Sequence, residues 1–395
     1  MKPRKIKDHI LTFGAVDWDR RLFDSLIPLP DGTSYNSYLV RGSEKTALID
    51  TVDPTKSEIL LENLRGVADL DYVVAHHGEQ DHSGSIPAVL EKYPKARVVC
   101  SPKAKGILVD LLAIPQDKFV TFEDGQTLSL GGLTLEFIHT PWVHWPETMV
   151  TYLREDKILF SCDFFGSHLA QSDLFVVDEG RVYEAAKRYF AEIMMPFRTA
   201  IQKNMERIKD LKIEMIAPSH GPLYDCPEFI MDAYREWISD KPKNSAVVAY
   251  VSMHGSTETM ISRLVAALAE RGVEVWQFNL ADIDIGKLAI ALVDAATIVL
   301  GTPAVHVGPH PKVAYAAFLA NALRPKLKFA SINGSYGWGQ KIVEQIAVMI
   351  PNLKVEVLAP VICRGLPREA DFVALDKLAD SIAQKHKELG LMSQG

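Results

Sequence analysis

A short polar segment carries side chains that can bind a metal ion. In His77-Gly-Glu79-Gln-Asp81-His82, two imidazoles and two carboxylates fall within six residues. An apolar stretch at 71–75 with the composition of a strand precedes them, so we expect these groups in a loop at a strand's carboxyl end. Imidazole and carboxylate together suit iron, manganese or zinc, and a cation would offset the charge of the acids. The spacing therefore predicts a metal site.

Three distant residues are candidate partners for this segment. His144 lies in Thr-Pro-Trp-Val-His-Trp-Pro, Asp163 in Phe-Ser-Cys-Asp and His220 in Ala-Pro-Ser-His-Gly. Each follows a predicted strand, so all of them can meet at one end of the strands. His76 should point away from the site, because successive side chains of an extended backbone face opposite ways.

A second chemical feature lies in the second half of the chain. An apolar strand at 246–251 leads into Ser252-Met-His254-Gly255-Ser256-Thr257 and then a helical segment. Backbone amides and hydroxyls at such a turn can surround a phosphate, and the helix N-terminus adds positive potential. Simple helix capping by Ser or Thr is the alternative. The lysine of a nucleoside-triphosphate loop and a Gly-x-Gly-x-x-Gly fingerprint are both absent from the sequence here, so neither familiar nucleotide site is predicted.

The elements around the metal motif are mixed. Strands are predicted at 37–40, 46–50, 71–75, 97–100, 133–138 and 157–160, and helices at 57–64, 85–92 and 183–211. A polar, proline-containing stretch at 239–244 then predicts a boundary between domains at 1–243 and 244–395. After it, strands at 246–251, 273–280, 296–300, 329–333 and 355–358 alternate with helices at 257–271, 283–292, 311–323, 340–350 and 369–389. This alternation predicts a doubly wound parallel sheet.

Composition narrows the class of protein. The 395 residues are 48% hydrophobic and carry a formal net charge of −7, so no overall positive field favours nucleic acid or an anionic membrane. The sequence has neither a signal-peptide core nor an apolar run of about 18 residues, and we expect no membrane span. Its four cysteines include no Cys-x-x-Cys pair, which argues against a rubredoxin centre and fits a reduced, cytoplasmic setting.

The metal pattern resembles that of the metallo-β-lactamase superfamily, in which His-x-His-x-Asp-His precedes a distant His, Asp and His. Glu79 stands here in place of the second histidine. The resulting motif, His-x-Glu-x-Asp-His, resembles that of one branch of the superfamily, the flavodiiron proteins. The resemblance implies an αββα sandwich followed by a flavodoxin-like domain, with two iron ions and FMN as cofactors. A carboxylate at position 79 adds a hard oxygen ligand and negative charge, which favours iron over zinc.

The resemblance also implies roles for individual residues. One iron is expected on His77, Glu79 and His144 and the other on Asp81, His82 and His220, with Asp163 bridging them. His168 is expected to reach the shell around the ligands. Phe190 is expected where several family members carry a tyrosine near the metals, and the adjacent Tyr189 is the alternative.

By the same resemblance, the first loop of the second domain holds the FMN phosphate and two later loops embrace the flavin ring. The residues expected to contact FMN are Ser252, His254, Gly255, Ser256, Thr257, Thr302, Pro303, Ala304, Val305, Gly334, Ser335, Tyr336, Gly337 and Trp338. Tyr336 and Trp338 could stack on the flavin, or their rings could simply pack the loop against the sheet.

The implied activity is reduction of dioxygen to water, of nitric oxide to nitrous oxide, or of both. The chain ends after the last predicted helix, so we expect the minimal class without a fused rubredoxin. Electrons are then expected from rubredoxin or another separate donor, possibly a reduced deazaflavin coenzyme. A head-to-tail homodimer or dimer of dimers is also implied. The competing hypotheses are a dinuclear zinc hydrolase with an appended flavodoxin domain and a non-catalytic electron-transfer flavoprotein; gas consumption would distinguish both from a reductase.

Overall fold

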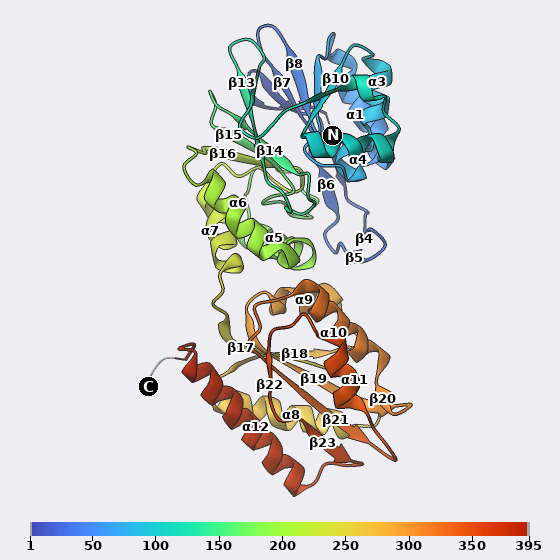
Figure 1. Ribbon diagram of the computed structural model, residues 1–395, viewed down its shortest axis with the longest axis vertical. Coiled ribbons are helices and arrows are strands. Elements are labelled where there is room, and N and C mark those ends of the chain that lie inside the picture. Colours follow the sequence, from blue (N-terminus) through green and yellow to red (C-terminus); the bar gives the residue numbers. More distant parts are fainter. Residues whose placement is uncertain (1, 393–395) are drawn as a thin grey trace. The chain divides into compact units, whose positions relative to one another are not determined.

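The computed structural model describes residues 2–392, which form two compact units (Figure 1). The first comprises the described residues up to Phe190 together with Phe197–Ile238, and the second comprises Ala191–Pro196 and the described residues from Ser239 onward. This division falls a few residues before the predicted boundary between 243 and 244, which itself stays a prediction.

The first unit contains two main sheets. One follows the order β1-β2-β7-β8-β9-β10-β11 and the other the order β12-β13-β14-β15-β16. The strands of the first sheet are β1 (Arg4–Lys7), β2 (Ile10–Thr12), β7 (Tyr38–Arg41), β8 (Thr46–Ile49), β9 (Tyr72–Val74), β10 (Arg97–Cys100) and β11 (Phe119–Thr121). Those of the second are β12 (Thr127–Ser129), β13 (Thr134–His139), β14 (Met149–Leu153), β15 (Ile158–Cys162) and β16 (Met215–Pro218). Short ribbons pair β3 (Ala15–Asp17) with β6 (Thr33–Tyr35) and β4 (Leu22–Phe23) with β5 (Ile27–Pro28).

Helices cover the outer faces of these sheets. They are α1 (Ser57–Asn63), α3 (Ile86–Lys92), α4 (Pro102–Leu112), α5 (Glu179–Tyr189), α6 (Arg198–Ile208) and α7 (Pro227–Ile238), and the short helix α2 (Gln80–Ser83) follows the loop after β9. Side chains of β7 alternate between two cores: Tyr38 and Val40 pack between the sheets, and Leu39 packs beneath the helices of the first sheet. Figure 1 shows α1, α3 and α4 beside the first sheet and α5, α6 and α7 beside the second. The predicted αββα sandwich is confirmed.

The helix predicted over 183–211 is wrong as a continuous element. α5 ends at Tyr189, a π-helical turn follows at Phe190–Met194, and α6 begins only at Arg198. Pro196 lies in the break, where it lacks a backbone N–H and would clash with the carbonyl four residues earlier in a continuous α-helix.

The second unit is a doubly wound sheet with the strand order β18-β17-β19-β21-β22. Its strands are β17 (Lys243–Tyr250), β18 (Glu274–Asn279), β19 (Ala295–Val305), β20 (Gly308–Pro309), β21 (Phe329–Tyr336), β22 (Glu356–Val357) and β23 (Val361–Arg364). The helices are α8 (Ser256–Glu270), α9 (Ile285–Leu292), α10 (Pro311–Leu323), α11 (Ile342–Met349) and α12 (Glu369–Glu388). Both β22 and β23 pair in parallel with β21. In chain order this is the flavodoxin pattern 2-1-3-4-5, with an interrupted fifth strand, so the predicted fold is confirmed.

Candidate metal centre and cofactor pocket

Loops at the ends of strands position the predicted metal ligands. β9 ends at Val74, and the chain passes through His77 and Glu79 into α2, which carries Asp81 and His82. The other three come from the second sheet's side: His144 precedes β14, Asp163 directly follows β15, and His220 follows β16. The two sheets thus deliver ligands to the same place.

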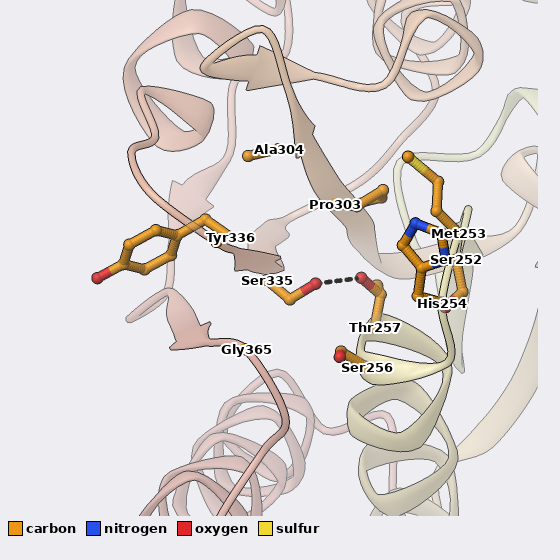
Figure 2. Close-up of a pocket in the computed structure, with 11 residues that line it drawn as sticks. Ser252, Met253, His254, Ser256, Thr257, Pro303, Ala304, Ser335, Tyr336 and Gly365 are labelled. Carbon is orange, nitrogen blue, oxygen red and sulfur yellow. Dashed lines mark hydrogen bonds between the residues drawn. The ribbon is translucent and has the colours of Figure 1, made fainter.

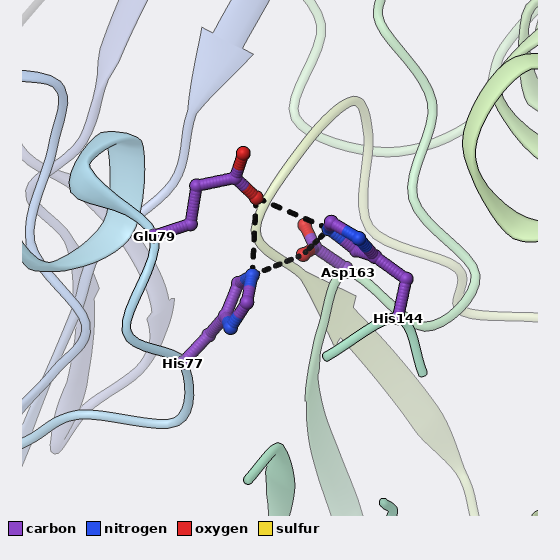
Figure 3. Close-up of side chains that lie close together, drawn as sticks. All are labelled: His77, Glu79, His144 and Asp163. Atoms are coloured by element: carbon purple, nitrogen blue, oxygen red, sulfur yellow. Dashed lines mark hydrogen bonds and ion pairs between the residues drawn. The ribbon is translucent and has the colours of Figure 1, made fainter. Parts of the chain in front are cut away.

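The first set of predicted ligands converges around His77 (Figure 3). Glu79 Oε2 lies 3.1 Å from the Nε2 atoms of both His77 and His144. Asp163 Oδ2 lies 3.6 Å from His77 Nε2 and 3.4 Å from His144 Nε2. The potential ligand atoms of these residues all lie within 4.8 Å of one another, as one metal ion requires.

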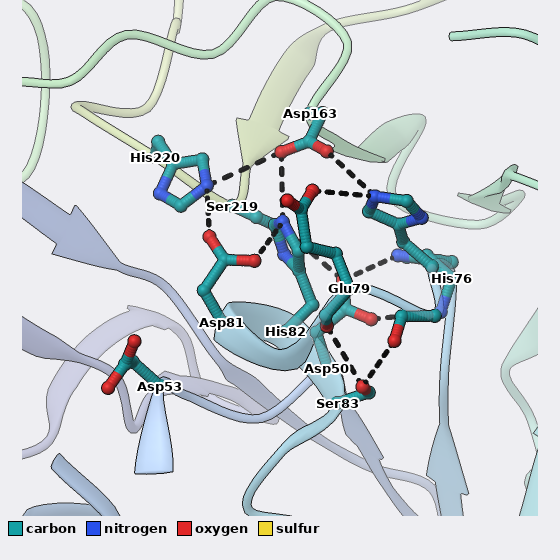
Figure 4. A network of polar contacts seen from close by, with 12 residues as sticks. Asp50, Asp53, His76, Glu79, Asp81, His82, Ser83, Asp163, Ser219 and His220 are labelled. Carbon is teal, nitrogen blue, oxygen red and sulfur yellow. Dashed lines mark hydrogen bonds and ion pairs between the residues drawn. The ribbon is translucent and has the colours of Figure 1, made fainter. Parts of the chain in front are cut away.

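The second set converges on the other oxygen of Asp163 (Figure 4). Asp163 Oδ1 lies 3.0 Å from His82 Nε2 and 3.3 Å from His220 Nε2. Asp81 places one oxygen 3.3 Å from His82 Nε2 and the other 3.1 Å from His220 Nε2. Each oxygen of Asp163 therefore faces a different set of histidines, which is the geometry of a bridging carboxylate.

The buried carboxylates of this cluster stabilise positive charge on or between the histidines. Burial alone would lower the pKa of His144, but Asp163 and Glu79 outweigh it and raise the pKa to about 9. In the same way Asp163 and Asp81 overcome burial and raise the pKa of His220 to about 10. Burial would raise the pKa of Glu79, yet His144 and His77 hold it below its usual range. At neutral pH the cluster retains cations, whether protons or metal ions.

Unsatisfied buried atoms show that these residues fit metal ions. Both carboxylate oxygens of Asp81 and of Asp163, as well as His82 Nε2, are buried without a hydrogen bond from any described residue. Buried polar groups in native proteins are almost always satisfied, and coordination would satisfy these. The donor set of imidazoles and carboxylates suits iron, manganese or zinc. That these residues bind iron stays a prediction.

A neighbouring group offers the contrast. Asp50, His76 and Cys162 also lie close together and buried. Here the Asp50 carboxylate accepts hydrogen bonds from the backbone N–H of His76 at 2.9 Å and from Ser219 Oγ at 3.1 Å, and it contacts His76 Nδ1 at 2.8 Å. His76 Nε2 lies 2.7 Å from Thr151 Oγ1. This group is satisfied by protein contacts and anchors the loop, with His76 turned away from the metal cluster.

Contacts to the Nδ1 atoms of two predicted ligand histidines orient their rings toward the cluster. His220 Nδ1 donates to the carbonyl oxygen of Ser34 at 2.6 Å, which leaves Nε2 to face the cluster. His77 Nδ1 lies 2.9 Å from Glu147 Oε1, a residue that sequence reasoning missed because no motif spacing marks it. Such partners fix the tautomer and ring orientation of metal-binding histidines.

The structure places His168 beside the cluster, although it contributes no atom to either set. Its ring centroid lies 4.8 Å from that of His220, and its Nδ1 lies 2.8 Å from Thr33 Oγ1. Burial and the neighbouring His220 lower the pKa of His168 well below its usual value, so it is neutral. Its Nε2 is buried with no hydrogen bond from the described residues.

The contacts of Phe190 do not support its expected place near the metals. Its ring packs against Tyr234 and Trp237, with centroid distances of 5.4 Å and 5.3 Å. Tyr189 instead places its ring 5.9 Å from that of His220. Adjacent residues of a helix point in different directions, so only one of the pair can face the cluster. Of these two residues, Tyr189 is the one beside the cluster.

The second unit holds a pocket between the turn after β17 and the ends of β19 and β21 (Figure 2). It is lined by Ser252, Met253, His254, Ser256, Thr257, Pro303, Ala304, Ser335, Tyr336, Gly337 and Gly365. Ser252 Oγ accepts from the backbone N–H groups of Gly255 and Glu258 at 3.2 Å each, which shapes the turn. Gly255 has a φ of 86°, a conformation that favours glycine.

Five residues predicted to contact the flavin fall outside this lining: Gly255, Thr302, Val305, Gly334 and Trp338. The chain that was expected as loops at 302–305 and 334–336 instead continues β19 and β21. A Cβ on Gly334 would lie 2.5 Å from the carbonyl oxygen of Thr302, so glycine at this position permits the two strands to pair. Trp338 is 76% exposed.

Other residues near the two sites were not predicted from the sequence. Met253 was within the predicted loop but carries no polar atom suited to a phosphate, and Gly365 follows the unpredicted strand β23. Asp24 lies in the turn between β4 and β5. Burial and the carboxylates of Glu79 and Asp81 raise the pKa of Asp24 to about 6, which places it near the cluster.

Within residues 2–392, no helix combines the length and apolar character that crossing a lipid bilayer requires.

Comparison with known proteins connects both sites to one architecture. Residues 33–221 match the model of a family described as ODP family beta lactamase. The chain is 36% identical to a nitric oxide reductase of Moorella thermoacetica over 97% of this chain and 99% of that protein. The structure of rubredoxin oxygen:oxidoreductase from Desulfovibrio gigas matches with a TM-score of 0.95 and 30% identity, covering 99% of this chain and 100% of that one. The flavodiiron protein from Giardia intestinalis matches with a TM-score of 0.91 and 26% identity over 98% of both chains.

Proposed function

This chain belongs to the flavodiiron protein family, and from that premise we propose how its residues divide the work of the family's reaction. The protein is an oxidoreductase that reduces dioxygen, nitric oxide or both. His77, Glu79 and His144 would hold one iron, Asp81, His82 and His220 would hold the other, and Asp163 would contribute one oxygen to each. The position of Asp163, with one oxygen toward each set of histidines, is the observation that carries this assignment.

When bound, two iron ions and FMN supply redox chemistry: four electrons convert dioxygen to water, and two convert a pair of nitric oxide molecules to nitrous oxide. The chain's own carboxylates contribute hard oxygen ligands and negative charge, which favour iron. Glu79 and His144 are 15% and 13% exposed, whereas Asp163 is 1% exposed. A small gas molecule therefore reaches the site from the side of Glu79 and His144.

Tyr189 is one residue that can hold a proton beside the proposed metal positions. Burial and the nearby Asp163 raise the pKa of its phenol well above the usual value, so it stays protonated at neutral pH. A buried phenol next to His220 can donate a hydrogen bond to a small polar molecule in the site.

In the second unit, Ser252, Ser256 and Thr257 would hold the FMN phosphate at the start of α8, where the helix N-terminus adds positive potential. Tyr336, Pro303 and Ala304 also line this pocket and would contact the flavin ring. The electron donor is rubredoxin or another separate carrier, possibly a reduced deazaflavin coenzyme. The protein acts in the cytoplasm as a head-to-tail homodimer or a dimer of dimers.

The test is anaerobic. The purified protein is fully reduced, iron and FMN are quantified per chain, and consumption of dioxygen and nitric oxide is compared with reduced rubredoxin as donor. Two irons, one FMN and turnover of either gas support the proposal, and His144→Ala should then lose iron and turnover while keeping FMN. Zinc without gas turnover, unchanged after iron reconstitution, would favour a hydrolase; iron and FMN without turnover would favour an electron carrier.

A further inference from the structure

Glu147 occupies a buried position directly behind the first set of predicted ligands. Its side chain is fully buried, as is that of His77. Glu147 Oε1 lies 2.9 Å from His77 Nδ1 and accepts the backbone N–H of Gly78 at 2.9 Å. The Glu147 backbone carbonyl accepts from Ser101 Oγ at 2.8 Å, which fixes the residue from the other side.

This carboxylate is not itself one of the predicted ligands. It faces the outer nitrogen of His77, while His77 Nε2 faces Glu79 at 3.1 Å. Its second oxygen, Oε2, is buried with no hydrogen bond from the described residues. Its charge is therefore poorly compensated except through His77 and Gly78, and the buried surroundings screen it weakly.

The other metal set has a different outer partner. His220 Nδ1 donates to the carbonyl oxygen of Ser34, a neutral group. A carboxylate on the outer N–H of a metal-binding imidazole makes that ligand more basic than a neutral carbonyl does. The two metal positions are therefore electronically unequal, even though each is built from histidine and carboxylate.

We propose that Glu147 is a positioning residue that holds His77 toward its metal and selectively favours the ferric state of the iron bound by His77, Glu79 and His144. This inference rests on the proposed metal centre. Because negative charge stabilises the more positive ion, the iron on the Glu147 side should have the lower of the two reduction potentials.

The charge can be removed with little change in shape by Glu147→Gln, whose amide oxygen can still accept from His77 and Gly78. The measurement is an anaerobic redox titration in which the mixed-valent state of the iron-loaded protein is followed by electron paramagnetic resonance. We expect the lower midpoint potential to rise, by about 59 mV for a tenfold loss in the preference for ferric iron. The two midpoints should move closer together, so less of the mixed-valent state should accumulate.

Asp156→Asn is the control, because Asp156 is a largely buried carboxylate that pairs with Lys7 and His9 in the turn between β14 and β15, at the other end of β15 from Asp163 and outside both metal sets. It should leave the gap between the midpoints unchanged. An unchanged or wider gap in an iron-loaded Glu147→Gln protein would overturn the inference. A narrowed gap of the same size in Asp156→Asn would overturn it too, since removal of a carboxylate far from both metal sets would then suffice.

A second measurement tests the inference even if the variant binds too little iron for a redox titration. Competition with a chelator gives the affinity for Zn²⁺ or Co²⁺ without any redox step, and loss of an outer partner typically costs 10–100-fold. We expect a loss in this range for Glu147→Gln and partial recovery in Glu147→Asp. Equal losses in both variants would indicate packing alone and contradict the inference. If the unsubstituted protein binds no iron, the proposed function fails. If it binds iron, and Glu147→Gln has the same reduction potentials and metal affinities as the unsubstituted protein, only this inference fails.

Discussion

Asp163 is the residue on which both halves of the proposed metal centre depend. It is buried, its oxygens point to different pairs of histidines, and among the described residues no donor hydrogen-bonds to them. Four imidazoles around one carboxylate can remain in place only with protons or metal ions between them. A change at this position should therefore act on both metal positions, whereas a change at a histidine should act chiefly on one.

Replacing Asp163 with asparagine should remove most of the bound iron from both positions and leave the FMN content unchanged. The amide lacks the negative charge that lets a carboxylate bridge two cations. Metal analysis together with the flavin absorbance of the same sample measures both quantities. His220→Ala is the comparison and should lose about one metal ion of the pair. Full iron content in Asp163→Asn would refute the bridging assignment.

At this scale the sequence revealed the ligands better than the residues that orient them. His77, Glu79, Asp81 and His82 are recognisable because a short spacing concentrates them after a strand. Glu147 carries no such mark, because its contact with His77 spans 70 positions and depends on how two loops meet. The choice between Tyr189 and Phe190 depends on the direction of the last helical residues, which the sequence leaves open.

The turns that follow strands are the elements that build both sites, and glycine is needed where a turn passes close to its neighbours. A Cβ on Gly78 would lie 2.7 Å from Ile107 Cγ2 and 3.2 Å from Glu147 Oε1. The turn between His77 and Glu79 can therefore hold its position only without a side chain at Gly78.

Gly78→Ala should destabilise the first unit by about 1–3 kcal/mol through overpacking and weaken metal binding about tenfold or more. Thermal unfolding of the metal-free protein and chelator competition measure the two effects. Gly106→Ala is the matched control, because Gly106 lies in α4 beside Ile107 and a Cβ there meets open space. The control should stabilise by about 0.5–1 kcal/mol, as alanine does in a helix interior. Similar behaviour of the two variants would show that the turn has room to move.

The turn between β17 and α8 allows a separate test of the cofactor pocket. Replacing Ser252 with alanine and Thr257 with valine removes the hydroxyl that organises the turn and the one that contacts Ser335 Oγ at 3.0 Å. We expect FMN affinity to fall about tenfold or more, since each lost hydrogen bond costs about 1 kcal/mol. Flavin fluorescence titration of the FMN-free protein measures this, with the exposed Ser262→Ala as control. Unchanged affinity would mean that the phosphate lies elsewhere.

The order of elements in the second unit could be predicted from the sequence, but their ends could not. The residues at 302–305 and 334–336 contain proline, glycine and serine, which favour loops, yet parallel pairing of Thr302 with Gly334 and of Pro303 with Ser335 extends both strands. β23 escaped prediction because it is short and follows Pro360, which interrupts the pattern of the fifth strand. Neighbouring strands thus overrode local preference where the pocket is formed.

For the molecule as a whole, a buried histidine sets the response of the second unit to acid. His386 is fully buried, with Nε2 at 2.7 Å from Thr297 Oγ1 and Nδ1 at 2.8 Å from Asn244 Oδ1. Burial lowers the pKa of His386 to about 4, against about 6.5 in an unfolded chain. The unfolded state therefore binds the proton more readily, and this stabilisation is present above pH 6.5 and lost as the pH falls toward 4.

We expect the free energy of unfolding of the second unit to fall by about 1–3 kcal/mol between pH 7 and pH 4 because of this histidine alone. Denaturant unfolding of the full chain at several pH values, monitored through the release of bound FMN, gives the dependence of the unfolding free energy on pH. His386→Gln should be less stable at pH 7 and show a shallower slope over the same range. An identical slope in the variant would show that other groups dominate the acid response.

The two sheets of the first unit contribute to the metal cluster from opposite sides: one ligand group follows β9, and the others adjoin β14, β15 and β16. A cation bound there acts as a cross-link between the halves of the sandwich, and it stabilises the closed form in proportion to its free concentration relative to its dissociation constant. Acquiring metal and completing the fold of this unit are therefore coupled. If the proposed metal centre is right, a chain that lacks its metal should be more easily opened between its sheets, so metal supply should also govern how long the protein survives.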